Sequence, residues 1–151
     1  MIETFTRDLE DGIKTEEKIL KMIQKILPNA HRVKGYCKDW DIYDPETAMG
    51  FEIKSDKKSQ ETGNIVVEMY FNGQPSALST TKATYWIFDT GVDIIVTTPD
   101  IIRKTIKDKQ IPLRTFIGKG DTKSKKAHLI PQKYLIETAL FVKPSNCDHL
   151  W

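Results

Sequence analysis

The sequence predicts a single mixed α/β or α+β domain, residues 1–151, built around a central sheet. Its 151 residues are 39% hydrophobic and 29% charged, which is enough to bury a core in one domain. A helical apolar pattern near the N-terminus is followed by several short runs of strand-forming residues. Helical patterns return towards the C-terminus, and this order is typical of a sheet covered by helices.

The elements follow from periodicity and turn residues. Thr15 can cap a first helix that runs to about Leu27, because apolar residues recur there at the helical period. Pro99, at a first-turn position, favours a second helix. In chain order we expect helices at 15–27, 99–108 and about 132–139, strands at 31–37, 40–44, 50–55, 64–71, 84–89 and 92–98, a turn at 72–76 and a glycine- and lysine-rich loop at 118–128.

Composition argues against several classes of protein. No run of 18 apolar residues occurs, so no membrane-spanning helix is expected. The acidic residues 1–12 lack the apolar segment of a signal peptide. Cys37 and Cys147 have the spacing of neither a metal site nor a disulfide framework. We therefore expect an intracellular, cytoplasmic protein.

The segment DWDIYDPETAMGFEIKSDKK, which begins at Asp39, predicts a hairpin with ionisable residues in both strands. Residues two apart share a face of a strand, so Glu52 and Lys54 lie together. A turn centred on residues 46–47 places Asp41 opposite Glu52, with Cβ atoms roughly 5 Å apart. Asp39 then lies opposite Lys54 and is the alternative to Asp41.

Two carboxylates at this position repel each other. At about 4 Å and an effective dielectric constant near 20, the cost is on the order of 4 kcal/mol. Protonation or a bound cation relieves it, and a ligand set of oxygen atoms suits Mg²⁺ or Mn²⁺. An exposed hairpin with a simple ion pair, worth under about 1 kcal/mol, fits the same residues.

Two further positions carry acids in apolar patterns. Glu16 faces along the apolar stripe of the first helix and Glu17 lies at its edge, although either also suits the first turn of a helix. Glu68 is the one acid in the apolar run NIVVEMYF. A buried glutamate must be paired, protonated or metal-bound, and Lys82 is a candidate partner.

A helix glutamate followed by Asp and by Glu-x-Lys resembles the PD-(D/E)xK nuclease superfamily, in particular its small phage-type, Holliday-junction-resolvase-like members. The matching residues are Glu16 in TEEKILKMI, Asp41 in WDIYD, and Glu52 and Lys54 in FEIKSD. Residues 62–89 also resemble phage nucleases of this group, so that the similarity covers roughly residues 14–89.

The resemblance has one departure, since Trp40 stands where the family pattern has a proline. It implies a restriction-endonuclease-like core, with a central mixed sheet of four to five strands flanked by helices. It also implies hydrolysis of DNA phosphodiester bonds with one or two Mg²⁺ (or Mn²⁺) ions, a homodimer, and the host cytoplasm for a phage-encoded protein.

The resemblance also assigns roles to residues. Asp41, Glu52 and the main-chain carbonyl of Ile53 would bind metal. Lys54 would orient or activate the attacking water, and Glu16 would hold a second metal or its water. Supporting positions around these ligands are Glu68, Asp39 and Glu17.

Positive charge is concentrated in one part of the chain. Residues 101–133 contain ten basic and two acidic residues, whereas residues 1–100 have a net charge of −5. Such an excess suggests a surface for a polyanion, although a solvated helix and loop would have the same composition. The residues expected to contact DNA are Lys57, Lys58, Thr80, Thr81, Lys82, Lys119, Lys123, Lys125 and Lys126.

The sequence predicts a metal-dependent DNA endonuclease, with cutting directed by DNA structure rather than by a long recognition site. An exonuclease fits the same residues. A nucleic-acid-binding module that kept the fold without catalysis is a second hypothesis, and a structural protein that uses these charges as ion pairs is a third.

Overall fold

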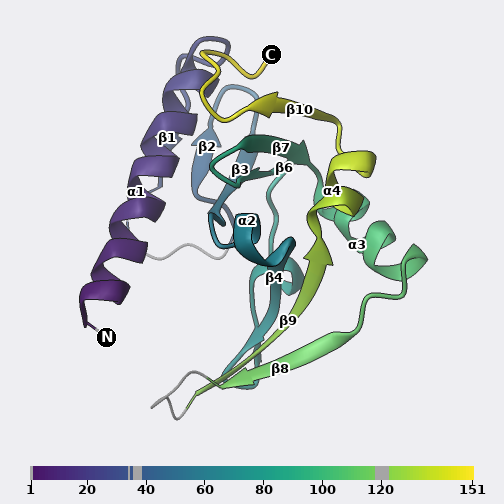
Figure 1. Cartoon of the computed structure of the whole chain (residues 1–151). Coiled ribbons are helices and arrows are strands. Elements are labelled where there is room, and N and C mark those ends of the chain that lie inside the picture. Colours follow the sequence, from purple (N-terminus) through teal and green to yellow (C-terminus); the bar gives the residue numbers. More distant parts are fainter. Residues whose placement is uncertain (1, 34, 36–38, 118–122) are drawn as a thin grey trace.

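The computed structural model describes residues 2–33, 35, 39–117 and 123–151, which form a mixed α+β fold with two sheets (Figure 1). Lys119 and Cys37 lie outside the described residues. Sheet A has six strands in the order β1-β2-β3-β6-β7-β10, and sheet B has four in the order β5-β4-β9-β8. None of the helices in the described part of the chain has the length and apolar content that a membrane span requires.

The strands of sheet A are β1 (His31–Arg32), β2 (Ile42–Asp44), β3 (Met49–Ser55), β6 (Tyr85–Asp89), β7 (Asp93–Thr97) and β10 (Phe141–Pro144). Those of sheet B are β4 (Asn64–Phe71), β5 (Gln74–Pro75), β8 (Leu113–Ile117) and β9 (Ser124–Pro131). The helices are α1 (Ile2–Gln24), α2 (Ser59–Thr62), the 3-10 helix η1 (Ala77–Ser79), α3 (Pro99–Asp108) and α4 (Gln132–Thr138). Sheet A is mixed, because β3 and β6 are parallel and its other pairs are antiparallel.

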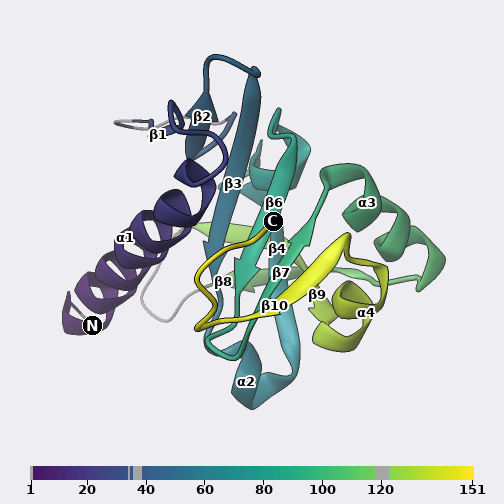
Figure 2. The same ribbon diagram turned by 90° about the horizontal axis from the view of Figure 1, so that it is seen from above.

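Sheet A separates two apolar cores. On one face, Ile19 of α1 packs with Phe51 and Ile53 of β3. On the other face, Trp86 of β6 packs with apolar residues of sheet B, α3 and α4. Figure 2 shows α1 on one side of this sheet and α3 and α4 on the other. Since side chains alternate along a strand, Glu52 lies on the face of β3 opposite Phe51 and Ile53.

Several elements confirm the expectations from the sequence. The strands expected at 50–55, 64–71, 84–89 and 92–98 and the helices at 99–108 and about 132–139 are formed as β3, β4, β6, β7, α3 and α4, with ends shifted by at most one residue. The side chain of Thr98 caps α3 by accepting a hydrogen bond from the Ile101 N–H at 3.2 Å. Asn72 and Gly73 adopt positive φ angles at the turn expected there.

The first helix begins much earlier than expected. It runs from Ile2, so that Thr15 is a buried residue inside α1 and not its N-terminal cap. The preceding residues contain no proline, and Gly12 costs the helix only about 1 kcal/mol relative to alanine. Threonine is a common N-terminal capping residue, but Thr15 lies inside the helix.

The prediction of one central sheet with four or five strands is wrong. The strand at 64–71 belongs to sheet B, where it pairs with β9. The segment 118–128, expected to be a loop, includes the first half of β9, because lysine stems can lie along a strand with the ammonium groups in solvent. Of the strand expected at 31–37, residues 31–32 form β1, residue 33 lies outside a strand, and residues 34, 36 and 37 lie outside the described residues. The strands β8 and β10 were not expected.

Candidate active site

The candidate site lies where β2 and β3 separate. These strands pair from Asp44 and Met49 to Ile42 and Phe51, which confirms the register predicted for the hairpin. Beyond Ile42 the ladder ends, and β3 continues beside β6. The expected pairing of Asp39 with Lys54 is therefore absent from the ladder.

Asp41 is held at this fork by both its main chain and its side chain. Its N–H donates a hydrogen bond to the Phe51 carbonyl at 2.9 Å. Its Oδ2 accepts a hydrogen bond from the Ile53 N–H at 2.8 Å. The carboxylate thus lies against the edge of β3 that faces β2, next to Glu52.

Glu52 and Lys54 project to the same face of β3, as predicted, and this face is opposite the one that carries Phe51 and Ile53. The Lys54 Nζ lies 3.1 Å from Glu52 Oε2 and 5.8 Å from the centre of the Trp86 ring. Trp86 is the residue of β6 that pairs with Glu52. Glu52, which is only 9% exposed, is therefore a carboxylate next to an apolar core.

Burial raises the pKa of Glu52 to about 7, since the Lys54 ammonium offsets the desolvation only in part and Asp41 and Glu16 oppose it. Burial also raises the pKa of Asp41, against the effect of the Ile53 N–H and of Lys54. For Lys54, burial favours the neutral form, but Glu52, Asp41 and Glu68 outweigh it, so that its pKa is raised. The lysine therefore stays charged beside two acids whose pKa values are raised.

Glu16 of α1 joins this cluster, and Glu17 does not. Burial, and next the charge of Asp41, raise the pKa of Glu16. Its Oε2 lies 3.5 Å from a guanidinium nitrogen of Arg32, which lowers that pKa in part. Glu17 is exposed and lies 3.9 Å from Arg32. The geometry therefore favours Glu16 of the two glutamates.

Arg32 is a residue of the site that sequence reasoning missed. It is a lone basic residue in the two-residue strand β1, and no pattern in the sequence marks it. Only the fold brings it against Glu16 of α1. The cluster thus combines three carboxylates with two cations, and negative charge is in excess.

Asp41 and Glu52 suit a hard divalent cation. Among the described residues, no three His, Cys, Asp or Glu side chains are arranged to hold one metal ion. Mg²⁺ commonly binds through one or two carboxylates and completes its shell with water and substrate phosphate. The half-buried carboxylate of Asp41, the buried carboxylate of Glu52 and the carbonyl of Ile53 would be the protein ligands of Mg²⁺ or Mn²⁺ in such a site.

Asp39 and Glu68 occupy neighbouring but different positions. The main-chain carbonyl of Asp39 accepts hydrogen bonds from the Lys82 N–H at 3.2 Å and the Thr81 hydroxyl at 3.3 Å. Glu68 accepts a hydrogen bond from the Ser76 hydroxyl at 2.7 Å and acts on Lys54 only through its charge. Asp39 thus fixes a loop, and Glu68 adds negative potential behind Lys54.

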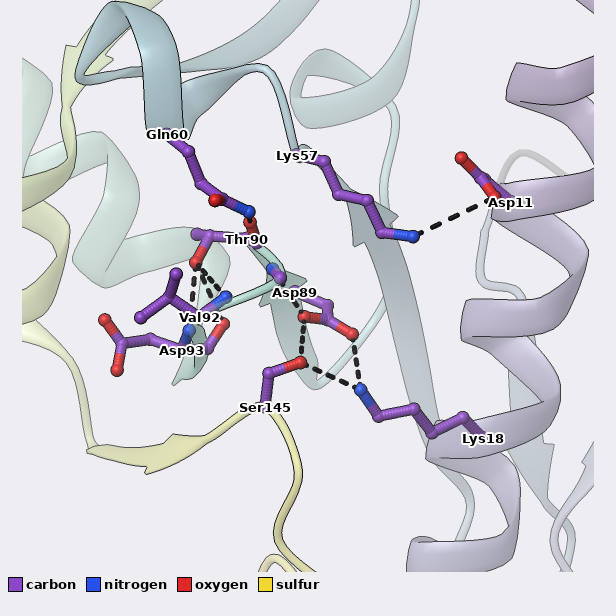
Figure 3. Close-up of polar contacts among 10 residues, drawn as sticks. Asp11, Lys18, Lys57, Gln60, Asp89, Thr90, Val92, Asp93 and Ser145 are labelled. Atoms are coloured by element: carbon purple, nitrogen blue, oxygen red, sulfur yellow. Dashed lines mark hydrogen bonds and ion pairs between the residues drawn. The ribbon is translucent and has the colours of Figure 1, made fainter.

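A cleft of about 380 Å³ extends from Lys54 towards α1. Its lining includes Asp11, Gly12, Lys57 and Lys58. Figure 3 shows Lys57 reaching across to Asp11 of α1, with Nζ 3.8 Å from the carboxylate. The expected DNA contacts at Lys57 and Lys58 therefore lie beside the carboxylate cluster.

The other expected DNA contacts differ in their surroundings. The Thr81 hydroxyl is used within the fold, since it accepts hydrogen bonds from Trp86 Nε1 at 3.1 Å and the Ala83 N–H at 3.2 Å. The Thr80 hydroxyl lies 3.4 Å from the Ala77 carbonyl. Lys82 is exposed before β6, and Lys123, Lys125 and Lys126 lie on or next to β9.

A second buried acid, Asp89, lies at the far end of β6. Its Oδ2 accepts from Lys18 Nζ at 2.8 Å, and its Oδ1 accepts from the Ser145 hydroxyl at 2.8 Å and the Gly91 N–H at 2.9 Å (Figure 3). These bonds connect α1, β6 and the C-terminal segment. No signal in the sequence distinguished Asp89 from the other acids.

The chain was also compared with protein-family models, with curated proteins and with solved structures. No family model, curated protein or solved structure matches it significantly.

Proposed function

We propose that the chain is a metal-dependent DNA endonuclease of the PD-(D/E)xK type, which hydrolyses phosphodiester bonds. One observation carries this proposal. The Asp41 carboxylate, fixed by the Ile53 N–H, lies beside the buried Glu52, whose pKa is about 7, and Lys54 lies 3.1 Å from Glu52. Acids with raised pKa values beside a cation that itself lines a cleft, as Lys54 does, are typical of catalytic sites.

The topology supports the same proposal. In sheet A, β2 is antiparallel to β3, and β3 is parallel to β6 after a long connection. Together with β7 and the covering α1, these strands form a mixed four-stranded unit flanked by a helix. This is the arrangement expected of a restriction-endonuclease-like core, to which sheet B is an addition.

Each residue of the cluster has a chemical task in this proposal. Asp41, Glu52 and the Ile53 carbonyl hold Mg²⁺ or Mn²⁺. When bound, such an ion would supply Lewis-acid polarisation of a phosphoryl oxygen and a hydroxide near neutral pH. Lys54 orients the attacking water and stabilises negative charge that develops on the phosphate. Glu16 accepts a hydrogen bond from a water molecule near the pair.

The charge distribution favours an enzyme over a binding module without catalysis. Without a cation, the carboxylates of Glu16, Asp41 and Glu52 repel the phosphates of DNA. A DNA-binding surface gains nothing from three acids grouped around Lys54, which lines the same cleft as Lys57 and Lys58. A metal turns the same acids into a site that attracts phosphate.

A substrate panel tests the proposal. Supercoiled plasmid, a four-way junction, a flap, a linear duplex and a single strand are incubated with Mg²⁺ or Mn²⁺. We expect cleavage of at least one of these DNAs by the wild type and none above background by Glu52→Gln. Glu61→Gln changes an exposed acid of α2 and should cleave like the wild type.

Two outcomes contradict the proposal. Binding of every DNA without cleavage in either ion would identify the chain as a binding module. Full cleavage by Glu52→Gln would show that the active site lies elsewhere. Gel filtration of the cleaving species with and without DNA tests whether the enzyme acts as a homodimer, which we also propose.

A further inference from the structure

The ends of β4, β9 and β8 form an arm that extends beyond sheet A, on the same side as the N-terminal half of α1 (Figure 1). The register gives this arm two distinct faces. Phe71 of β4 and Phe116 of β8 both pair with Lys125 of β9. Directly paired residues project to the same face, so these three side chains form one row across three strands.

Two more cations flank this row. Arg114 and Lys123 lie two residues from Phe116 and Lys125, and residues two apart share a face. The Nζ of Lys123 lies 5.9 Å from the centre of the Phe71 ring. We call this set of five residues the basic–aromatic face. It alternates three cations with two aromatic rings.

Parts of the basic–aromatic face reach solvent. Phe71 is 46% exposed, Arg114 and Lys123 are exposed, and Phe116 and Lys125 are half-buried. Within the described part of the chain, Arg114, Lys123 and Lys125 form no ion pair. Both the rings and the charges of this face are therefore free to contact a ligand.

We propose that the basic–aromatic face binds unpaired nucleotides, so that the substrate is DNA with a single-stranded segment beside a duplex. This inference rests on the proposed nuclease function and names its class of substrate. Exposed aromatic rings stack on bases, and neighbouring cations hold the phosphates. Bases inside a duplex are covered by their neighbours and cannot stack on Phe71 or Phe116.

The position of the face agrees with a role next to the site. Glu68, whose charge acts on Lys54, lies three residues before Phe71 on β4. That separation is about 10 Å along a strand. A nucleotide stacked on Phe71 therefore lies close enough to connect directly to DNA in the cleft beside Lys54.

A second copy of the chain fits this face less well. In a two-fold symmetric contact, the same patch meets itself. Arg114, Lys123 and Lys125 of one copy would then face the same cations of the other, and Glu68, which pairs with Ala127 as Arg114 does, offsets at most one of these three charges. A polyanion complements these charges, so we assign the face to nucleic acid.

Binding without cleavage tests the inference. Fluorescence anisotropy in EDTA measures the affinity of the full chain for an oligo-dT strand and for a blunt hairpin duplex of equal phosphate number. We expect Phe71→Leu and Phe116→Leu to weaken oligo-dT binding by about 5- to 50-fold, from the stacking contribution of one base. Duplex binding should change less than about twofold.

The opposite face of β8 supplies the matched control. Ile117 is 67% exposed and projects away from Phe116. Ile117→Ala should leave both affinities within about twofold of the wild type. Leucine at 71 and 116 keeps apolar packing, and the melting temperature of each variant is measured alongside to exclude unfolding.

Three results would overturn the inference. The first is equal binding of oligo-dT by the wild type and both phenylalanine variants. The second is an equal loss of single-strand and duplex binding. The third is a wild-type dimer that Phe71→Leu converts to a monomer without weakening oligo-dT binding. Because EDTA removes catalysis, a failed binding test here is distinct from a failed cleavage test with Mg²⁺.

Discussion

Two sites in this molecule contain acidic side chains that are largely removed from solvent, and the sites differ in how far that negative charge is compensated. Asp89 is 3% exposed, and its two oxygens accept three hydrogen bonds, one of them from a lysine. The carboxylates of Asp41, Glu52 and Glu16 lie close together, and the nearby cations compensate only part of their negative charge. The first cluster is balanced, and the second is not.

The difference indicates what each cluster is for. A balanced buried acid holds elements together, as Asp89 does for α1, β6 and the C-terminal segment. Acids that repel one another lower stability in the metal-free protein, so the fold keeps them only with a compensating function. We propose that a cation bound between Asp41 and Glu52 supplies the missing charge.

The largest difference should appear in cleavage. Asp41→Asn removes a metal-binding charge, and we expect the cleavage rate to fall about 10³-fold or more. Asp39→Asn should reduce it less than about threefold, because Asp39 contacts the 81–82 loop through its main-chain carbonyl. Initial rates on the best substrate of the panel measure both. Similar losses in the two variants would remove the distinction between these aspartates.

The next largest difference between the two sites should be in the free energy of unfolding. Asp89→Asn leaves Lys18 without its carboxylate, and we expect the free energy of unfolding to fall by about 2–3 kcal/mol. Urea denaturation in EDTA measures the change. Asp100→Asn breaks an exposed ion pair with Arg103 and should cost under about 1 kcal/mol. If Asp89→Asn had the same free energy of unfolding as the wild type, the hydrogen bonds of Asp89 would not stabilise the fold.

Glu52→Gln should change stability in the opposite direction, and the change should depend on pH. The pKa of Glu52 is about 7 in the folded protein against 4.5 ordinarily, so the folded state binds more protons between these values. The contribution of Glu52 to the free energy of unfolding therefore falls as pH rises from 4.5 to 7.

Glutamine has no such titration. In EDTA, we expect the stability of Glu52→Gln relative to the wild type to rise from near zero at pH 4.5 to on the order of 1–3 kcal/mol at pH 8. Urea denaturation at four pH values measures this difference. A difference that is constant with pH would show that the pKa of Glu52 is not raised in the folded protein.

The smallest effect should distinguish two adjacent glutamates. Glu16→Gln removes the half-buried acid next to Asp41, and we expect a cleavage rate about tenfold lower. Glu17→Gln changes an exposed residue and should stay within twofold of the wild type. The two variants are matched in chemistry and chain position, so equal rates would exclude Glu16 from the site.

Local patterns predicted the parts of the site that lie close together in sequence. The hairpin register followed from the turn, and it places Ile42 opposite Phe51 as expected. The alternation of side chains placed Glu52 with Lys54 on one face of β3. Both features depend on a few consecutive residues, so the sequence contains the information.

Features that depend on distant pairing could not be predicted in this way. Sheet B exists because β9 pairs with β4, more than 50 residues earlier, and no local period shows this. Arg32 contacts Glu16 of α1 and Asp89 contacts Lys18 of α1, and both contacts form only when α1 packs beside them in the folded chain. The start of α1 was missed because Thr15 has the composition of a cap.

Calorimetric titration with Mg²⁺ tests most directly whether the Asp41–Glu52 pair is a cation site. At pH 6.5 we expect saturable binding to the wild type, with release of a proton seen as a dependence of the heat on the buffer, because Glu52 must lose its proton. Glu52→Gln should bind far more weakly and release no proton, whereas Glu61→Gln should match the wild type. Equal Mg²⁺ binding by the wild type and Glu52→Gln, or no binding by the wild type, would contradict the account.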